Sequence, residues 1–218
     1  MTGLSQYSAE NVLNYIVGKT AMPALPTAYL ALFTAVGTDA GTGFTEVSGG
    51  GYARVATSAA DWNAASGLAP SSITNAVALS FPLSTASWGN VVAAGLYDAA
   101  TGGNLLAWDY LGNNPWFPFS ATLASPGVLT APGITAGSTP NLADGSIVVV
   151  NDEYGGTLPG GLADGTQYTV AGLSADSFNV GVNTTTVGSG MVRQVNIQSV
   201  PTNVSVSFAI GALKLVLS

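Results

Sequence analysis

Short apolar runs separated by turn-forming residues make up most of the chain after Pro26, and this pattern most strongly constrains the fold. Each run is bounded by Gly, Pro, Asn or Asp, as is typical of strands joined by turns. The clearest runs are TAYLALFTA, YARVAT, AVALSFP, NVVAAGLYD and NLLAWDYL. Their spacing predicts a mainly β protein with a β-sandwich or barrel-like core. The loop Asp98–Gly103 predicts a hairpin, since its glycines tolerate positive φ.

A short amphipathic helix is predicted at the N-terminus, over residues 9–17. Ser8 can cap its start and Gly18 can end it. One face of this helix carries three apolar residues, Val12, Tyr15 and Ile16. The helix is not needed to close the sheet, so we expect this face to be a contact surface.

The composition changes near Ser125. From Pro126 to Arg193 aromatic residues become rare, Gly and Thr increase, and a nine-residue pattern occurs as LADGSIVVV and again as LADGTQYTV. Asp-Gly predicts a turn in each copy and the following residues predict a strand. We therefore predict a small inserted β module over 126–193, within a core formed by 1–125 and completed by 194–218.

Three consecutive glycines, Gly49 to Gly51, raise the question of a phosphate-binding loop. Such a loop needs a helix N-terminus after it, so that backbone N–H groups converge on the anion. The following residues, YARVATSAADW, alternate and have no helical period. We interpret the glycines as a turn or bulge that leads into a strand.

Charge and residue types exclude several functions. The chain has 4 Lys and Arg against 11 Asp and Glu, a net charge of −7, so direct nucleic-acid binding is not expected. It has no Cys and no His, which removes thiolate catalysis, zinc–thiolate sites and the usual general base. We expect no enzyme activity, no cofactor and no metal site.

Carboxylates leave two alternatives open. Two carboxylates from distant positions could meet in space and do glycosidase chemistry. Asp152 and Glu153 are the closest pair in the sequence, but neighbours in a strand point to opposite faces. A calcium site built from Asp144, Asp152 or Asp164 is conceivable, although EF-hand spacing is absent. We interpret these acids as solvated turn residues.

Low charge and high apolar content point to assembly. Charged residues form 7% of the chain, mean hydropathy is +0.41, and no apolar stretch is long enough for a membrane-spanning helix. We expect apolar surface to be hidden against other subunits, in a homo-oligomer for which a trimer is the expected state, with no membrane contact. In NNPWFPFS two prolines bracket apolar residues, which makes Trp116, Phe117 and Phe119 candidate interface residues.

Several phrases in this order resemble a family of small structural proteins of tailed bacteriophages: YLALFTA, GTGFTEVSGGGYAR, LSFP, WGNVVAAGLYDAATGGNLLAW and VSFAIGALKLVLS. Within the expected insert, GGTLPGGLADGTQYTV and DSFNV are similar to a small β module of phage tail and capsid proteins.

The resemblance implies a virion component without catalytic residues, whose partners are the major capsid protein or other virion proteins. We expect a capsid decoration (cement) protein on the capsid surface. One alternative is a tail, baseplate or tail-fibre component that contacts the host. A second alternative is a glycan-binding or depolymerase module.

Overall fold

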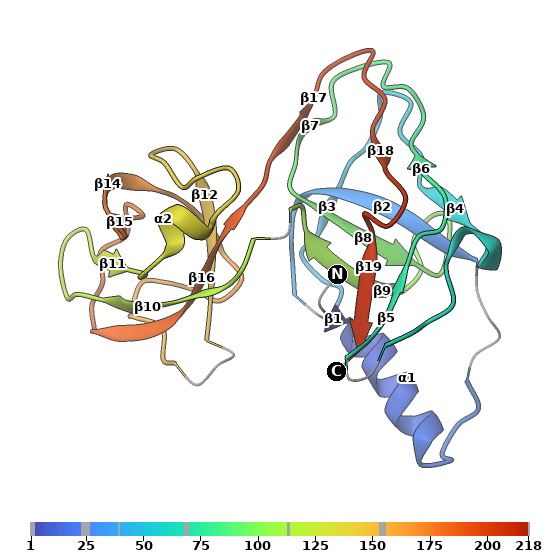
Figure 1. Cartoon of the computed structure of the whole chain (residues 1–218), viewed down its shortest axis with the longest axis horizontal. Coiled ribbons are helices and arrows are strands. Elements are labelled where there is room, and N and C mark those ends of the chain that lie inside the picture. Colours follow the sequence, from blue (N-terminus) through green and yellow to red (C-terminus); the bar gives the residue numbers. More distant parts are fainter. Residues whose placement is uncertain are drawn as a thin grey trace. The chain divides into compact units, whose positions relative to one another are not determined.

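The computed structural model describes residues 3–22, 27–38, 40–67, 70–112, 114–152 and 156–217, drawn as a ribbon in Figure 1. The chain forms two compact units, which we describe separately. Unit 1 is Met1–Leu111 with Gln198–Ser218, and unit 2 is Gly112–Ile197. The expected mainly β structure with a short N-terminal helix is confirmed.

Unit 1 is built on a six-stranded antiparallel sheet with the order β1-β9-β8-β2-β3, in which β4 also pairs with β2. The strands are β1 (Gly3–Leu4), β2 (Ala28–Ala35), β3 (Thr45–Glu46), β4 (Val55–Thr57), β8 (Ala93–Tyr97) and β9 (Leu105–Tyr110). The predicted hairpin joins β8 to β9, and its Gly102 and Gly103 have φ of 60° and 76°. A 3-10 turn, η1 (Ala59–Asp61), follows β4.

A long antiparallel ribbon forms the second layer of unit 1. The last residues of the chain run back along residues 71–91 and pair with them in three places. The pairs are β5 (Ser71–Thr74) with β19 (Lys214–Leu217), β6 (Leu79–Ser80) with β18 (Ser207–Phe208), and β7 (Gly89–Val91) with β17 (Gln198–Val200). The C-terminal segment, which follows unit 2 in the chain, thus completes unit 1.

The core of unit 1 lies between the sheet and the ribbon. Apolar side chains of the sheet, such as Leu30, Leu32 and Leu96, cluster with ribbon side chains such as Phe81 and Val200. Burial of these side chains from both layers is the main force that holds the ribbon on the sheet. This arrangement matches the predicted sandwich-like core.

Helix α1 spans Gln6–Ile16, so the predicted range of 9–17 with a Ser8 cap is wrong by about one turn. Ser5 is the N-cap, and its side chain accepts a hydrogen bond from the Ser8 N–H at 3.3 Å. The Ser5 hydroxyl also donates to the carbonyl oxygen of Leu105 in β9. The cap is therefore chosen by a contact with the sheet, which the local sequence does not reveal.

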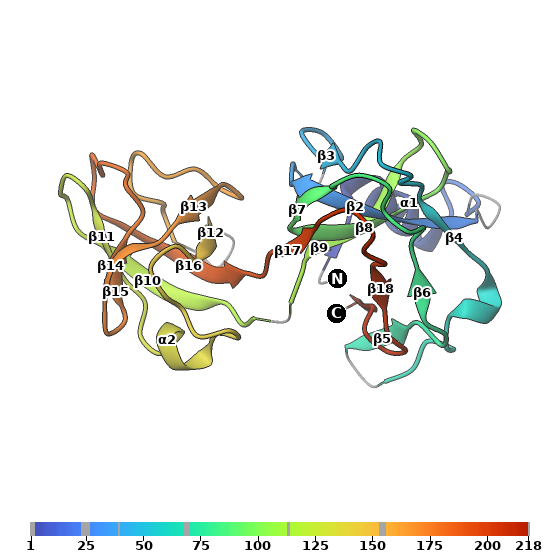
Figure 2. The same ribbon diagram turned by 90° about the horizontal axis from the view of Figure 1, so that it is seen from above.

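Unit 2 is a seven-stranded antiparallel sheet with the order β13-β12-β16-β10-β11-β15-β14. The two end strands, β13 and β14, follow one another in the chain and are separated only by Val170, so the sheet curls into a nearly closed barrel (Figure 2). The strands are β10 (Phe117–Ala121), β11 (Val128–Thr130), β12 (Ile147–Asn151), β13 (Gln167–Thr169), β14 (Ala171–Ser174), β15 (Ser177–Asn179) and β16 (Gly188–Val195). A short helix, α2 (Ile134–Gly137), follows β11.

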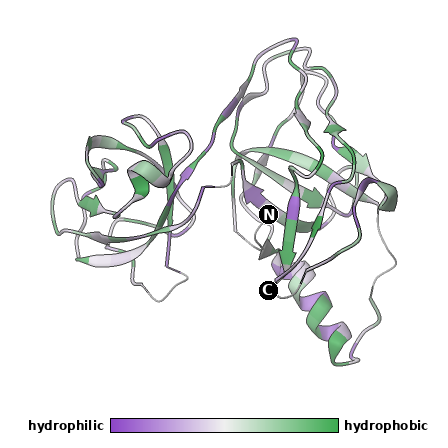
Figure 3. Cartoon of the chain, viewed as in Figure 1, coloured by the Kyte–Doolittle hydropathy of each residue, from purple (hydrophilic) through white to green (hydrophobic). Residues whose placement is uncertain are grey.

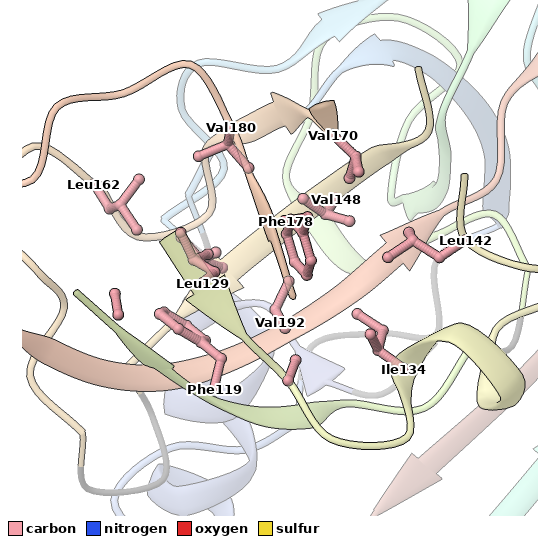
Figure 4. Packing of buried hydrophobic residues seen from close by; sticks show 13 residues of the cluster. Phe119, Leu129, Ile134, Leu142, Val148, Leu162, Val170, Phe178, Val180 and Val192 are labelled. Atoms are coloured by element: carbon pink, nitrogen blue, oxygen red, sulfur yellow. The ribbon is translucent and has the colours of Figure 1, made fainter. Parts of the chain in front are cut away.

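The barrel is filled by its own apolar side chains. Figure 4 shows them converging from several strands around Phe178, with Leu129 and Val192 nearby. The two LADG copies behave as predicted, because each turn is followed by a strand, β12 or β13. Leu142 and Leu162, the first residues of the copies, belong to the same core.

The compact unit extends beyond the predicted module of 126–193. β10 lies before that range, yet it pairs with β16 on one side and with β11 on the other. The barrel needs β10 to connect these strands, so the unit runs from Gly112 to Ile197. That the unit folds independently as an insertion stays a prediction.

Candidate functional site

The glycine-rich turn is structural. Gly49, Gly50 and Gly51 have φ of 67°, 54° and 76°, a conformation that other residues rarely adopt. A Cβ at Gly50 would lie 2.9 Å from the carbonyl oxygen of Ala86, and the indole N–H of Trp88 donates to the Gly50 carbonyl oxygen at 2.9 Å. The prediction of a turn leading into a strand is confirmed.

The turn delivers Arg54 to the centre of a polar network. Its Nε and Nη2 atoms donate to the two carboxylate oxygens of Glu46 at 2.8 and 2.7 Å, with the Arg54 side chain only 6% exposed. Nη1 donates to the carbonyl oxygens of Ala99 and Gly102, each at 2.8 Å. The guanidinium carbon lies 3.6 Å from the ring centroid of Tyr97, a cation–π contact. Arg54 therefore ties β3 and the turn to the β8–β9 hairpin.

The pKa values of Arg54 and Tyr52 are both shifted upward in this network. Burial by itself lowers the pKa of Arg54, but the hydrogen bonds and charge of Glu46 raise it above its ordinary value overall. The Tyr52 hydroxyl donates to Glu46 Oε1 at 2.8 Å and accepts from the Leu32 N–H at 3.0 Å. Burial, reinforced by the Glu46 charge, raises the pKa of Tyr52 far above its usual range. Neither group is suited to exchange protons near neutral pH.

Several aspartates serve as anchors of turns. Asp61 accepts hydrogen bonds from the backbone and side chain of Ser58, which lower its pKa. Asp176 accepts from the Thr135 side chain and from the backbone N–H groups of Gly133 and Thr135, which lower its pKa too. Backbone N–H groups also donate to Asp98, from Asn104, and to Asp144, from Leu173.

The structure gives no support to a carboxylate site in the part of the chain that it describes. Asp152 is exposed, and Glu153 lies outside the described residues. No group of three Asp or Glu side chains that could hold a metal ion occurs among those described. That Asp144 anchors β14 through Leu173 favours the interpretation of a turn residue.

Helix α1 has an exposed apolar end. No α1 side chain is buried, with Leu13 and Ile16 63% and 69% exposed. Of the predicted residues, Tyr15 is exposed and Val12 is half-buried. Figure 3 shows green, apolar residues on this helix. We define the α1 surface as Leu13, Tyr15, Ile16 and Val17, four exposed apolar residues.

Leu13 and Val17 lie outside the predicted contact face of Val12, Tyr15 and Ile16. They lie three residues before and one after Ile16, on a stripe next to the predicted one. The signal was present, since apolar residues follow one another from Val12 to Val17 with only Asn14 between them. The helix end is apolar around much of its circumference.

The PWFPF segment is less exposed than expected. Phe119 is 3% exposed and belongs to the barrel core, so it is not on the surface. Phe117 is half-buried against the same core. Trp116 is half-buried too, with its ring centroid 5.0 Å from the guanidinium carbon of Arg193, which is buried. Trp116 therefore contributes to packing in unit 2, and an interface role for Trp116 and Phe117 stays a prediction.

One end of unit 2 forms a second exposed surface. Three loops, 122–127, 156–161 and 181–187, meet there. The Ala124 N–H donates to Thr184 Oγ1 at 3.1 Å, and the Gly160 N–H donates to Thr186 Oγ1 at 2.8 Å. These loops contain no charged residue, and they expose Leu123 and Val187. We call this surface the neutral loop end. The sequence predicts turns in these segments but does not indicate that they form one surface.

Among the described residues, no helix combines the length and apolar character needed to cross a membrane.

No curated protein sequence matches the chain. A family model described as podophage GP4 fiber I protein gp80 matches residues 3–115, slightly more than half of the chain. The match contains α1, the six-stranded sheet and the Arg54 network. The chain therefore belongs to the family of podophage GP4 fiber I protein gp80, and it is a structural component of a phage virion.

Proposed function

We propose that this protein is a non-enzymatic component of a phage tail fibre, attached to other virion proteins through the α1 surface. The observation that carries the proposal is the match to a fibre family over residues 3–115. This finding does not support the expected capsid cement role, and it fits the tail-fibre alternative better.

The α1 surface is the best candidate for attachment within the matched region. A surface helix normally buries an apolar stripe against its own core, yet α1 buries no side chain. Its single charged residue is Glu10. Exposed apolar side chains grouped on one element usually mark an interaction site. Another virion protein that covers Leu13 and Ile16 would remove them from water.

Unit 2 is the proposed host-contacting part. Apart from its first residues it lies outside the family match, so it is an addition to the matched part. Its neutral loop end exposes Thr185 and Thr186 together with the apolar Leu123 and Val187. The lack of charge there suits contact with a neutral surface.

Absence of catalysis is part of the proposal. The chain has no His or Cys, Arg54 and Tyr52 are held in a buried network, and described aspartates such as Asp61, Asp98 and Asp176 anchor turns. The purified protein should release no reducing ends from host polysaccharide.

Two matched phage mutants test the proposal. Leu13→Ser with Ile16→Ser should give particles that lack the protein and adsorb poorly, with heads as resistant to heat and osmotic shock as before. Leu123→Ser with Val187→Ser should leave the protein on the particle but reduce adsorption. Antibody labelling in electron microscopy should place the wild-type protein on the tail. Label on the head, or heads weakened by loss of the protein, would contradict the proposal and favour the cement role.

A further inference from the structure

The middle of the C-terminal ribbon strand is hydrogen-bonded along one side. The Phe81 N–H donates to the Val206 carbonyl oxygen at 2.8 Å, and the Ser84 N–H donates to that of Val204 at 3.1 Å. Phe208 continues the pairing opposite Leu79. Val204, Val206 and Phe208 therefore direct their backbone groups toward residues 79–84.

The residues between them have the opposite orientation. In an antiparallel ladder, backbone groups of successive residues point alternately to the two sides. The N–H and C=O groups of Ser205 and Ser207 thus point away from β6, and they have no backbone partner in the part of the chain that the structure describes. Both serines are exposed. In Figures 1 and 2, β18 has β6 on one side and no strand of the same layer on the other.

A hollow lies beside this edge. It has a volume of about 340 Å³ and is lined by residues 204–208 together with Leu32, Val91, Leu111 and Gln198. No lining residue is charged. The side chains of Val204, Val206 and Phe208 are only half-buried, so a strand added to the edge would cover apolar surface as well as pair with backbone groups.

The edge also lacks the usual protection against pairing. Proteins commonly shield exposed edge strands with Lys, Pro or inward-pointing charges. From Gln198 to Leu213 the chain has no charged residue, and its one proline, Pro201, lies outside the free stretch. An edge with these properties is expected to be covered in the working assembly.

We propose that a second copy of this chain covers the edge, with the two strands antiparallel around a twofold axis at Val206. The sequence Ser205-Val206-Ser207 is the same in both directions, so this axis places Ser205 opposite Ser207 of the partner subunit. The outward backbone groups then form reciprocal hydrogen bonds on both sides of the axis, as an isologous interface requires. The facing side chains are small and uncharged hydroxyls, which are compatible across strands.

Charge favours a second copy as the occupant. The whole chain carries −7, so contacts between copies through its acidic parts would be repulsive. The neutral stretch 198–213 is a place where two copies can meet without like-charge repulsion. The pairing is independent of the attachment proposed for α1.

Proline at position 207 tests the pairing. Ser207→Pro removes an N–H that points away from β6 and leaves the hydrogen bonds to residues 79–84 in place, a position where edge strands tolerate proline. In sedimentation equilibrium the wild type should form dimers, and Ser207→Pro should weaken them about tenfold or more. Ser207→Ala keeps the backbone N–H and should dimerise as the wild type does.

A second variant tests the pairing even if Ser207→Pro fails to fold. Ser205→Lys with Ser207→Lys places exposed ammonium groups opposite each other across the axis, so dimerisation should weaken at low salt and recover at high salt. Leu13→Ser with Ile16→Ser should not affect it. The dimer replaces the trimer expected from composition, so a wild type that forms trimers would overturn the proposal. A wild type that stays monomeric would also overturn it, as would dimers insensitive to Ser207→Pro. If the wild type is monomeric and Ser207→Pro only prevents incorporation of the protein into particles, the edge pairs with a strand of another virion protein.

Discussion

The N–H of Gly145 donates to the carbonyl oxygen of Val170 at 2.9 Å, and the N–H of Gly165 returns the same bond to Val150 at 2.9 Å. Gly145 and Gly165 are the fourth residues of the two LADG copies, and Val150 and Val170 are the ninth. Val148 and Tyr168, the seventh residues, face each other in the β12–β13 pair. The two copies are thus related by a local twofold axis. In each copy the Asp-Gly turn is hydrogen-bonded to the last residue of the other copy.

This exchange predicts a matched pair of effects. Gly145 and Gly165 have φ of 89° and 66°, and a Cβ at either position meets nothing within 4 Å. Gly145→Ala and Gly165→Ala should each reduce the free energy of unfolding of unit 2 by about 1–2 kcal/mol, through backbone strain alone. Asn tolerates positive φ better, so Gly→Asn at either position should have a smaller effect. Urea unfolding measures both, and equal losses for Ala and Asn would contradict this explanation.

The Arg54 network should stabilise unit 1 as a unit. Arg54→Met leaves Glu46 without its bidentate partner and frees the β8–β9 hairpin, so the free energy of unfolding should fall by about 3 kcal/mol. Arg54→Met with Glu46→Gln should lose less than the sum of the single changes, since both remove the same ion pair. Denaturant titration of the four proteins forms the cycle. Strict additivity would show that the pair contributes no coupling.

Asp176 should make unit 2 sensitive to acid. Its pKa is lowered in the folded state by hydrogen bonds from Thr135 and Gly133, so its stabilisation is present above the unfolded pKa, near about 4. It is lost as pH falls from there through the lower folded value. Asp176→Asn should flatten the pH dependence of stability in this acid range. Thr135→Val removes the hydroxyl donor and should flatten it partly, whereas an unchanged slope in both variants would exclude this role.

Unit 1 should fold without unit 2. The Leu111 N–H donates to the Val92 carbonyl oxygen at 2.8 Å, and Gln198 pairs with Val91, so the two ends of the excursion are anchored next to each other. Replacing residues 112–197 with a short Gly-Ser linker should retain cooperative unfolding and a β circular dichroism spectrum. As a contrast, deletion of 126–193 alone should aggregate, because it leaves β10 without β11 and most of β16. An insoluble linker protein would show that unit 1 depends on unit 2.

The sequence by itself determined the local elements. Turn residues and alternating apolar runs identified the strands, the hairpin at Asp98–Gly103 and the glycine turn at Gly49–Gly51, because these depend on backbone preferences of neighbouring residues. The resemblance of the phrases, in their order, to a family of phage structural proteins implied a virion structural protein. The apolar character of α1 was also visible before its surroundings were known.

Tertiary structure decided which segments meet. The cap of α1 moved to Ser5 because its hydroxyl reaches Leu105, about a hundred residues away. Phe119 lies in the barrel core because β10 completes the barrel. The strands of the two LADG copies pair with each other. The free edge at Ser205 and Ser207 exists only because the C-terminal segment returns to residues 71–91. Such long-range pairing depends on burial shared between distant strands, and a local pattern carries no information about which partner a strand will find.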